Sequence, residues 1–505
     1  MRSENSVKNS LFAIVGQAVS LIFGFVTRKV FINILGETYL GINGIFYSVL
    51  SLLSLTELGL GSAITFSLYK PIADRDDEKT GRIMNLYALA YRIVAAVVTL
   101  LGLCLMPFLG KIAVEVPRLR LIFLLFLINS AASYLFSYRR ALITAAEMDW
   151  RNTLNNAVFQ VLQNLAQLVI LLKTRNYLLY LVAQLVCTVA SNIEISIAAA
   201  KIFPFLGRVK GLPDTETSST IKSNVTSMFM TRFGSVAVTG TDNLLISTVS
   251  VALTGLYSNY LLILQTIQVI LNQVMTAVTA SVGNLIATDD SEKRLDIYKD
   301  VILATAWLYG FSAIALDCLM TRFIGVFFGT GLSIPEGAVH LMCLNFYLAG
   351  IRQPNLMYIN AAGLFRPVRF RGFVEAAVNL AVSAIFLWMG MGLFGVLLGT
   401  TVSHFATSIW WEPWCVSKFC LGGKAAAGFA GMNLISGAVL IAAWAVNHFV
   451  VGLFGDGLPA FFGAVCVTAV IPNLIFLLAY CKTPQFGFFK NVTLNIARKF
   501  IKRAN

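Results

Sequence analysis

Long apolar runs are the feature of this chain that most restricts its fold. They follow one another along almost the whole sequence, and each has the roughly 20 residues that a helix needs to cross a bilayer. Of the 505 residues, 57% are hydrophobic and 12% are charged, whereas a soluble domain carries about 25% charged residues. The runs are continuous rather than alternating, which excludes a transmembrane barrel. The sequence therefore predicts an all-α polytopic membrane protein.

The spacing of the apolar runs predicts about 14 transmembrane helices. We expect these helices near residues 10–34, 39–69, 82–110, 119–145, 153–173, 177–203, 222–249, 252–287, 298–329, 336–362, 367–390, 392–418, 426–450 and 458–481.

The first part of the chain recurs in its second half at a constant offset and without a gap. Identical residues stand at equivalent positions of the two copies, and the register continues into the charged loop that follows. The identical pairs include Lys8 and Lys222, Thr27 and Thr241, Ile32 and Ile246, Gly41 and Gly255, Leu50 and Leu264, and Ala63 and Ala277. A repeat of this length indicates a duplicated half of a membrane protein, as in many transporters.

The repeat predicts two six-helix lobes. An even number of crossings gives both copies the same orientation, so we expect a parallel pseudo-two-fold axis along the membrane normal. The last two helices have no counterpart in the first copy. The predicted parts are an N-lobe at 1–204, a cytoplasmic linker at 205–221, a C-lobe at 222–420, two further helices at 421–481, and a basic amphipathic cytoplasmic tail at 482–505.

The net charge of +14 is explained by the membrane topology of the chain rather than by nucleic-acid binding. With the N-terminus placed in the cytoplasm, 27 of the 38 Lys and Arg residues fall in cytoplasmic loops and tails, and six fall in outer loops. This bias follows the positive-inside rule. We therefore expect a multi-pass membrane protein with both termini in the cytoplasm.

The sequence contains no pattern typical of an enzyme or of a metal protein. The eight cysteines form no CxxC pair, and His340, His404 and His448 lie far apart in the chain, so no metal site is predicted. We find no nucleophile–base pair and no nucleotide loop, and we expect neither catalysis nor a cofactor.

Ionisable residues within apolar helices are costly, and they usually face a cavity or a partner. One carboxylate and five arginines lie at depths that place them in or near the cytoplasmic half of their helices. Arginine suits phosphate because its planar fork binds two oxygens and stays charged. We expect a pyrophosphate-binding cavity lined by Arg92, Arg139, Arg140, Arg232, Arg352 and Glu57.

Arg28 and Asp242 occupy equivalent positions of the two copies. Pseudo-symmetry predicts that they face each other across the central axis, where a contact between them would close the outer gate. The alternative is that Asp242 binds a coupling cation while Arg28 contacts the substrate.

The N-terminal third of the chain contains a set of recognisable stretches: residues 24–29 (GFVTRK), 35–44 (LGETYLGING), 52–64 (LLSLTELGLGSAI) and 68–71 (LYKP), with Tyr91-Arg92 and Tyr138-Arg139-Arg140. In these stretches it resembles bacterial polysaccharide flippases of the multidrug/oligosaccharidyl-lipid/polysaccharide (MOP) exporter superfamily, and the helix plan fits throughout. The resemblance implies a location in the bacterial plasma membrane, where an undecaprenyl-pyrophosphate-linked oligosaccharide is flipped by alternating access. Coupling to a Na⁺ or H⁺ gradient occurs in some members.

Two alternatives remain open at this point. A multidrug or cation antiporter could share the fold, although a basic cavity disfavours a cationic substrate. A membrane-embedded polysaccharide polymerase is disfavoured by the short outer loops. For the flippase, the expected partners are the lipid-linked oligosaccharide, membrane lipids and polysaccharide polymerase or export machinery, with the protein acting as a monomer and without nucleic acid.

Overall fold

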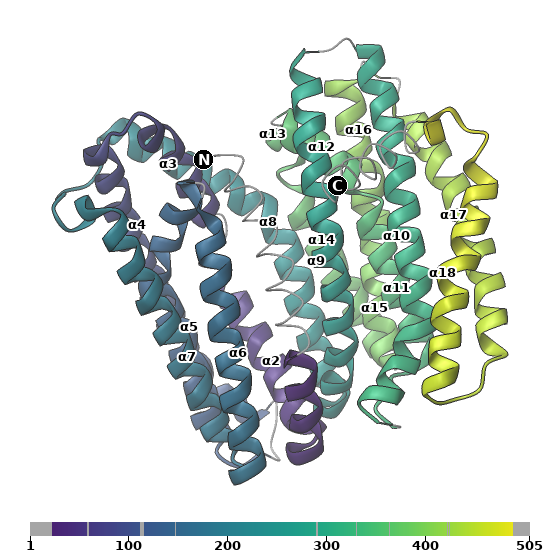
Figure 1. Cartoon of the computed structure of the whole chain (residues 1–505), viewed down its shortest axis with the longest axis horizontal. Coiled ribbons are helices and arrows are strands. Elements are labelled where there is room, and N and C mark those ends of the chain that lie inside the picture. Colours follow the sequence, from purple (N-terminus) through teal and green to yellow (C-terminus); the bar gives the residue numbers. More distant parts are fainter. Residues whose placement is uncertain are drawn as a thin grey trace, which may run out of the picture. The chain divides into compact units, whose positions relative to one another are not determined.

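The computed structural model describes residues 23–57, 60–111, 116–146, 148–288, 291–329, 331–362, 364–421, 423 and 425–487. Within these ranges every regular element is a helix (Figure 1). The prediction of an all-α protein is therefore confirmed, while the count of 14 spans stays a prediction. Most of the expected amphipathic tail, from residue 488 onward, lies outside the described residues.

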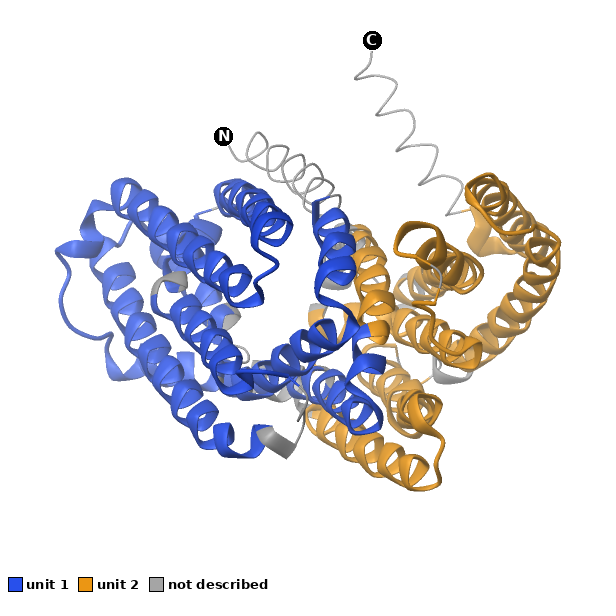
Figure 2. Cartoon of the chain, turned by 90° about the horizontal axis from the view of Figure 1, so that it is seen from below, with its two compact units in different colours: residues 1–255 blue, residues 256–505 orange. Residues whose placement is uncertain are grey.

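The chain divides into two compact units, Met1–Gly255 and Leu256–Asn505 (Figure 2). In unit 1, a helix over residues 23–35 precedes the following elements: α2 (Glu37–Leu53), η1 (Ser54–Glu57), α3 (Leu60–Ala73), α4 (Asp77–Leu105), η2 (Met106–Lys111), α5 (Leu119–Ala145), α6 (Asp149–Thr174), α7 (Tyr177–Ile202), η3 (Pro204–Gly207) and α8 (Thr215–Val249). Here α5 packs against α4 and α7, and α8 packs against α2 and α3. The lobe boundaries drawn from the repeat stay a prediction.

Unit 2 holds nearly all of α9 (Val251–Thr288) and the rest of the chain. Its other elements are α10 (Ser291–Phe327), α11 (Glu336–Gly350), α12 (Gln353–Ala361), α13 (Phe365–Val368), α14 (Arg371–Trp388), α15 (Gly392–Ser403), η4 (His404–Ser408), α16 (Ile409–Cys420), α17 (Ala425–Gly452) and α18 (Leu458–Tyr480). The two last helices pack together and against α10.

Eight of the helical segments in the described part of the chain are long and apolar enough to cross a membrane, and a bent pair within α5 would make a ninth. Their outer surfaces carry large apolar side chains, such as Trp388 with 89% of its surface exposed and Leu434 with 75%. Apolar surface on this scale is expected to face lipid rather than water. The prediction of a multi-pass membrane protein is confirmed.

Helices begin at equivalent positions in the two copies of the sequence repeat. Helix α2 begins at Glu37, and α9 begins at Val251, the position equivalent to Glu37 in the second copy. Helix α4 begins at Asp77, and α10 begins at the equivalent position, Ser291. The two copies therefore share local structure as well as sequence.

Two equivalent glycines of the copies meet inside unit 1, where α2 crosses the start of α9. A Cβ atom on Gly41 would lie 1.9 Å from the carbonyl oxygen of Val251, and one on Gly255 would lie 2.4 Å from the carbonyl oxygen of Glu37. Only residues without a Cβ allow the two backbones this approach.

Carboxylates of loop residues cap the N-termini of two long helices. Asp76 accepts a hydrogen bond from the backbone N–H of Lys79 at 2.8 Å, at the start of α4. Asp214 accepts one from the backbone N–H of Thr217 at 3.0 Å and one from its hydroxyl at 2.7 Å, at the start of α8. The bonds from Thr217 hold the pKa of the Asp214 carboxyl below its usual value.

Several of the expected spans are interrupted in the structure, and three of the interruptions lie well inside a span. Residues 39–69 form α2, η1 and α3, residues 336–362 form α11 and α12, and residues 392–418 form α15, η4 and α16. The second break falls next to Pro354 in the first turn of α12, where proline removes a backbone donor and ends the preceding helix. The third is a π-turn, a feature common at functional sites.

Candidate functional site

Unit 1 contains a polar cavity of about 560 Å³. Its walls come from η1 and from helices α5, α6 and α7. Two charged side chains, Glu57 and Arg140, line it together with amides and hydroxyls that include Asn156, Gln160, Ser191 and Asn192. Amide and hydroxyl groups both donate and accept hydrogen bonds, so such walls suit a ligand rich in hydroxyls.

The guanidinium of Arg140 is held in this cavity by uncharged acceptors. It donates to the side-chain oxygens of Asn156 at 2.8 Å, Asn155 at 2.8 Å, Ser191 at 2.9 Å and Asn192 at 3.2 Å. The carboxylate of Glu194 accepts from Asn155 and forms no ion pair with Arg140 in the described part of the chain. Among the described residues, Arg140 therefore combines a fixed position with a positive charge that no direct ion pair neutralises, while the carboxylates of Glu194 and Asp149 interact with it at longer range. A fixed positive charge of this kind suits the binding of an anion.

Glu57 is the last residue of η1 and accepts a hydrogen bond from the Tyr91 hydroxyl at 2.6 Å. The Tyr91 ring in turn packs edge-on against Tyr87, with ring centroids 4.9 Å apart. These contacts anchor the carboxyl group to α4. Since Glu57 and Arg140 line one cavity, its described walls carry both an acidic and a basic group.

The other sequence-predicted arginines of unit 1 have different surroundings. Arg139 donates to the backbone carbonyl of Ser196 at 2.9 Å and lies over the ring of Tyr138. Arg92 is exposed on the surface of α4. Arg232 belongs to α8, and its side chain lies outside the described residues.

Both members of the expected gate belong to unit 1. Asp242 is buried in α8, and Arg28 is half-buried in the helix over residues 23–35. A buried carboxylate in an apolar helix is costly and marks a functional position. The pairing of Arg28 with Asp242 stays a prediction.

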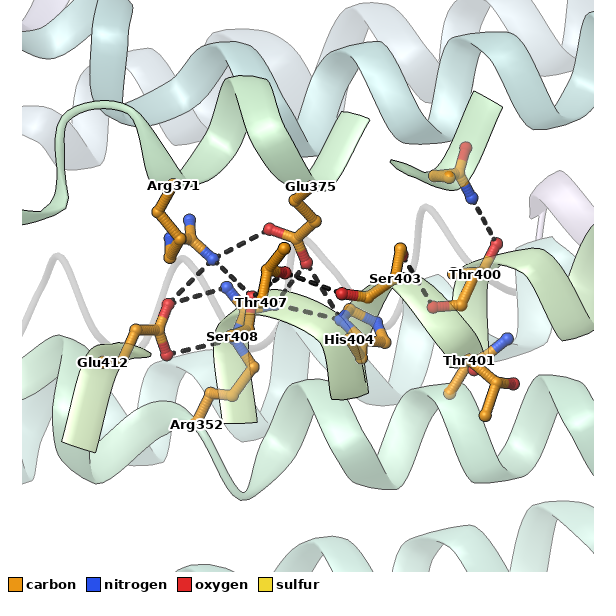
Figure 3. Close-up of polar contacts among 12 residues, drawn as sticks. Arg352, Arg371, Glu375, Thr400, Thr401, Ser403, His404, Thr407, Ser408 and Glu412 are labelled. Atoms are coloured by element: carbon orange, nitrogen blue, oxygen red, sulfur yellow. Dashed lines mark hydrogen bonds and ion pairs between the residues drawn. The ribbon is translucent and has the colours of Figure 1, made fainter. Parts of the chain in front are cut away.

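Arg352 lies in unit 2, at the junction of α11 and α12, inside a buried ion network (Figure 3). It donates to both carboxylate oxygens of Glu412, at 2.8 Å and 3.1 Å, and to Glu375 at 3.1 Å. Arg371 lies 2.8 Å from each of the same two carboxylates. His404 completes the network, with its Nδ1 atom 3.0 Å from Glu375.

Helical spacing brings this network together. Arg371 and Glu375 are one turn apart on α14, and Figure 3 shows them facing the residues that follow α15. Across from them, His404, Ser408 and Glu412 recur every four residues through the π-turn into α16. Two guanidinium groups balance two carboxylates, so the charge of Arg352 is compensated by direct ion pairs. The described residues give Arg140 no such pair.

Sequence reasoning selected Arg352 but missed its partners Arg371, Glu375, His404 and Glu412. The available signal was the four-residue spacing of ionisable groups within apolar helices, which places them on one helix face. That spacing could have indicated two polar faces, although not that they meet around Arg352.

Several solved structures have a similar fold, and three of them are described as a flippase or as transporters. A lipid II flippase, MurJ, in an inward-closed conformation matches with a TM-score of 0.63 and 15% identity, covering 93% of this chain and 98% of that one. A multidrug resistance MATE family transporter of the MOP superfamily in an inward-facing conformation matches with a TM-score of 0.57 and 13% identity, covering 83% and 99%. This chain shares the fold of these two structures.

A third similar structure is a MOP superfamily transporter from Pyrococcus furiosus, described as having a binding pocket of reverse polarity. It matches with a TM-score of 0.56 and 15% identity, covering 83% of this chain and 96% of that one. No family model matches the sequence, and no curated protein does.

Proposed function

We propose that this protein is a flippase for undecaprenyl-pyrophosphate-linked oligosaccharide repeat units. It would move them from the cytoplasmic to the outer leaflet of the bacterial plasma membrane by alternating access, for cell-surface polysaccharide biosynthesis. The proposal makes it a transporter rather than an enzyme. It acts as a monomer with both termini in the cytoplasm, and hands its product to polysaccharide polymerase or export machinery.

The observation that carries the proposal is the guanidinium of Arg140, fixed by uncharged acceptors in the polar cavity of unit 1. A pyrophosphate offers oxygens in the planar arrangement that a guanidinium fork recognises. The surrounding amides and hydroxyls are of the kind that bind sugar hydroxyls. The fold is compatible with this use, since a lipid II flippase is among the similar structures.

Replacing Arg140 with alanine is expected to reduce flipping of a pyrophosphate-linked sugar by about 10–100-fold, because a hydrogen bond to a charged group contributes about 1.5–3 kcal/mol. The measurement is translocation of a fluorescent undecaprenyl-pyrophosphate-linked oligosaccharide in reconstituted vesicles, with and without Na⁺ and H⁺ gradients. Replacing Arg120, an exposed arginine on the same helix, is the matched control and should leave the rate unchanged. Equal rates for the Arg140→Ala variant and the wild type would refute the proposal.

A MATE-like cation antiporter is the second candidate, and the carboxyl group of Glu57 in the same cavity favours it. The two candidates predict opposite results in one experiment. If the substrate is a cation, Glu57→Gln abolishes ion-coupled export of a cationic drug and Arg140→Ala leaves it intact. If the substrate is a pyrophosphate, no drug export is expected from any variant.

Charge reversal tests the proposed gate. We expect Arg28→Asp and Asp242→Arg each to lower transport strongly, because each places like charges opposite one another in a low-dielectric region. The double variant should recover a large part of the wild-type rate in the same vesicle assay. If Asp242 instead binds a coupling cation, the double variant stays inactive and the gate hypothesis is wrong.

A further inference from the structure

A cluster of metal-binding side chains lies in unit 2, outside the sites described above. Asp317 and Cys318 are neighbours on α10, and His448 lies on α17, one turn before its end. One carboxylate oxygen, the thiol sulfur and one ring nitrogen of these residues all lie within 4.8 Å of one another. The two helices are far apart in the chain, which is why spacing in the sequence alone does not reveal the group.

The carboxylate of Asp317 is fixed in place by two further groups. Trp444 donates its indole N–H to one oxygen at 2.6 Å, and Nδ1 of His340 lies 2.7 Å from the other. The side chain of Asp317 is 3% exposed. A buried carboxylate oriented by an indole and an imidazole resembles the outer-shell arrangement that positions metal ligands.

The rings of His340, Trp444 and His448 pack against one another beside the donor atoms. The rings of His340 and His448 have their centroids 5.9 Å apart, and Trp444 packs against both, at 5.6 Å and 5.2 Å. Cys318 belongs to the apolar cluster in which α10, α17 and α18 pack together. The donor atoms thus lie at the edge of an apolar core, while both histidines remain partly accessible.

We propose that Asp317, Cys318 and His448 form a binding site for a zinc-like divalent transition metal ion. Thiolate, imidazole and carboxylate together suit zinc better than magnesium or calcium, which prefer oxygen ligands alone. In a tetrahedral zinc site, bond lengths of about 2.0–2.3 Å put ligand atoms roughly 3.3–3.8 Å apart. Side-chain rotations that move the donors about 1 Å closer would complete the site.

The charges of the cluster balance around such an ion. On binding, the Cys318 thiol loses its proton to solvent, and the thiolate and the Asp317 carboxylate together neutralise a divalent cation. His340 and Trp444 act as positioning residues through Asp317. A fourth coordination position is left for water. The bound ion would fasten α17 to α10 near the end of the helix bundle where α10 ends and α11 begins.

Metal content and cobalt spectroscopy test this proposal. The full-length protein, purified in detergent with an affinity tag that lacks histidine, is stripped with chelator and titrated with Zn²⁺ and then with Co²⁺. We expect one ion per chain and a thiolate-to-cobalt charge-transfer band in the near ultraviolet. Cys318→Ser should abolish that band, and His448→Gln and His340→Gln should weaken affinity by at least 10-fold. Cys415→Ser, at a buried cysteine of α16, is the matched control and should retain wild-type binding.

A second measurement does not depend on the folding of a variant. In the wild-type protein, Zn²⁺ should slow maleimide labelling of Cys318, as mapped by mass spectrometry, and should leave labelling of the exposed Cys466 unchanged. It should also raise the melting temperature of the wild type and not that of Cys318→Ser. The proposal is overturned if the wild type binds no stoichiometric metal, if the cobalt band persists in Cys318→Ser, or if Zn²⁺ does not protect Cys318.

Discussion

Replacing Glu412 with alanine is expected to destabilise unit 2 by about 3–5 kcal/mol, the usual cost of removing one partner from a buried ion pair. Glu412 is fully buried and bridges Arg352 and Arg371. Without it, two buried guanidinium groups share the single carboxylate of Glu375. The side chains of Arg352 and Arg371 are only 11% and 10% exposed, so solvent compensates little of the excess charge.

The measurement is the melting temperature of the detergent-solubilised protein. It is determined from the fraction of protein that remains monodisperse after heating. Glu78→Ala is the matched control, because Glu78 pairs with Arg82 at 2.5 Å with 69% of its side chain exposed. An exposed pair contributes little, so this variant should melt within a few degrees of the wild type. A Glu412→Ala variant as stable as the Glu78→Ala variant would show that the network does not support the fold.

Replacing Gly41 with alanine is expected to cost about 1–3 kcal/mol or more through overpacking at the crossing of α2 and α9. The new methyl group would lie 1.9 Å from the carbonyl oxygen of Val251. The obstacle is backbone rather than a flexible side chain, so the two helices themselves must separate. Gly255→Ala should behave similarly, since its Cβ would meet the carbonyl oxygen of Glu37 at 2.4 Å.

The same thermal assay distinguishes this steric effect from the general effect of removing a glycine. Gly24 lies in the preceding helix, and a methyl group added there would have nothing within 4 Å. Gly24→Ala should therefore be neutral or stabilising, because alanine favours a helix by up to about 1 kcal/mol relative to glycine. Equal melting temperatures for Gly41→Ala and Gly24→Ala would contradict the close approach of the two backbones.

Local patterns predicted the helices well. The expected helix at 252–287 is α9 over Val251–Thr288, and the expected helix at 177–203 is α7 over Tyr177–Ile202. Hydropathy depends on residues close in sequence, which is why the helices can be predicted from the sequence. The breaks within 39–69 and 392–418 were not predicted, because a short 3₁₀ or π segment leaves an apolar run unbroken.

The candidate site was predicted less completely. The sequence selected Arg140 and Glu57, which line one cavity, and it selected Arg352 without the carboxylates that compensate it. Burial cost marks an arginine in an apolar helix as important, but it does not distinguish an arginine held by uncharged acceptors from one paired with carboxylates. That distinction depends on which face of a neighbouring helix lies opposite.

The sequence by itself determined that this chain is a duplicated, all-helical membrane protein, because hydrophobicity and an internal repeat are properties of the chain alone. Only the tertiary structure decided which polar side chains meet: Arg371 with Glu412, and Asp317 with His340 and Trp444. Successive residues on a helix point about 100° apart. A small rotation of one helix about its axis therefore changes which of its side chains face the neighbouring helices. Packing sets that rotation.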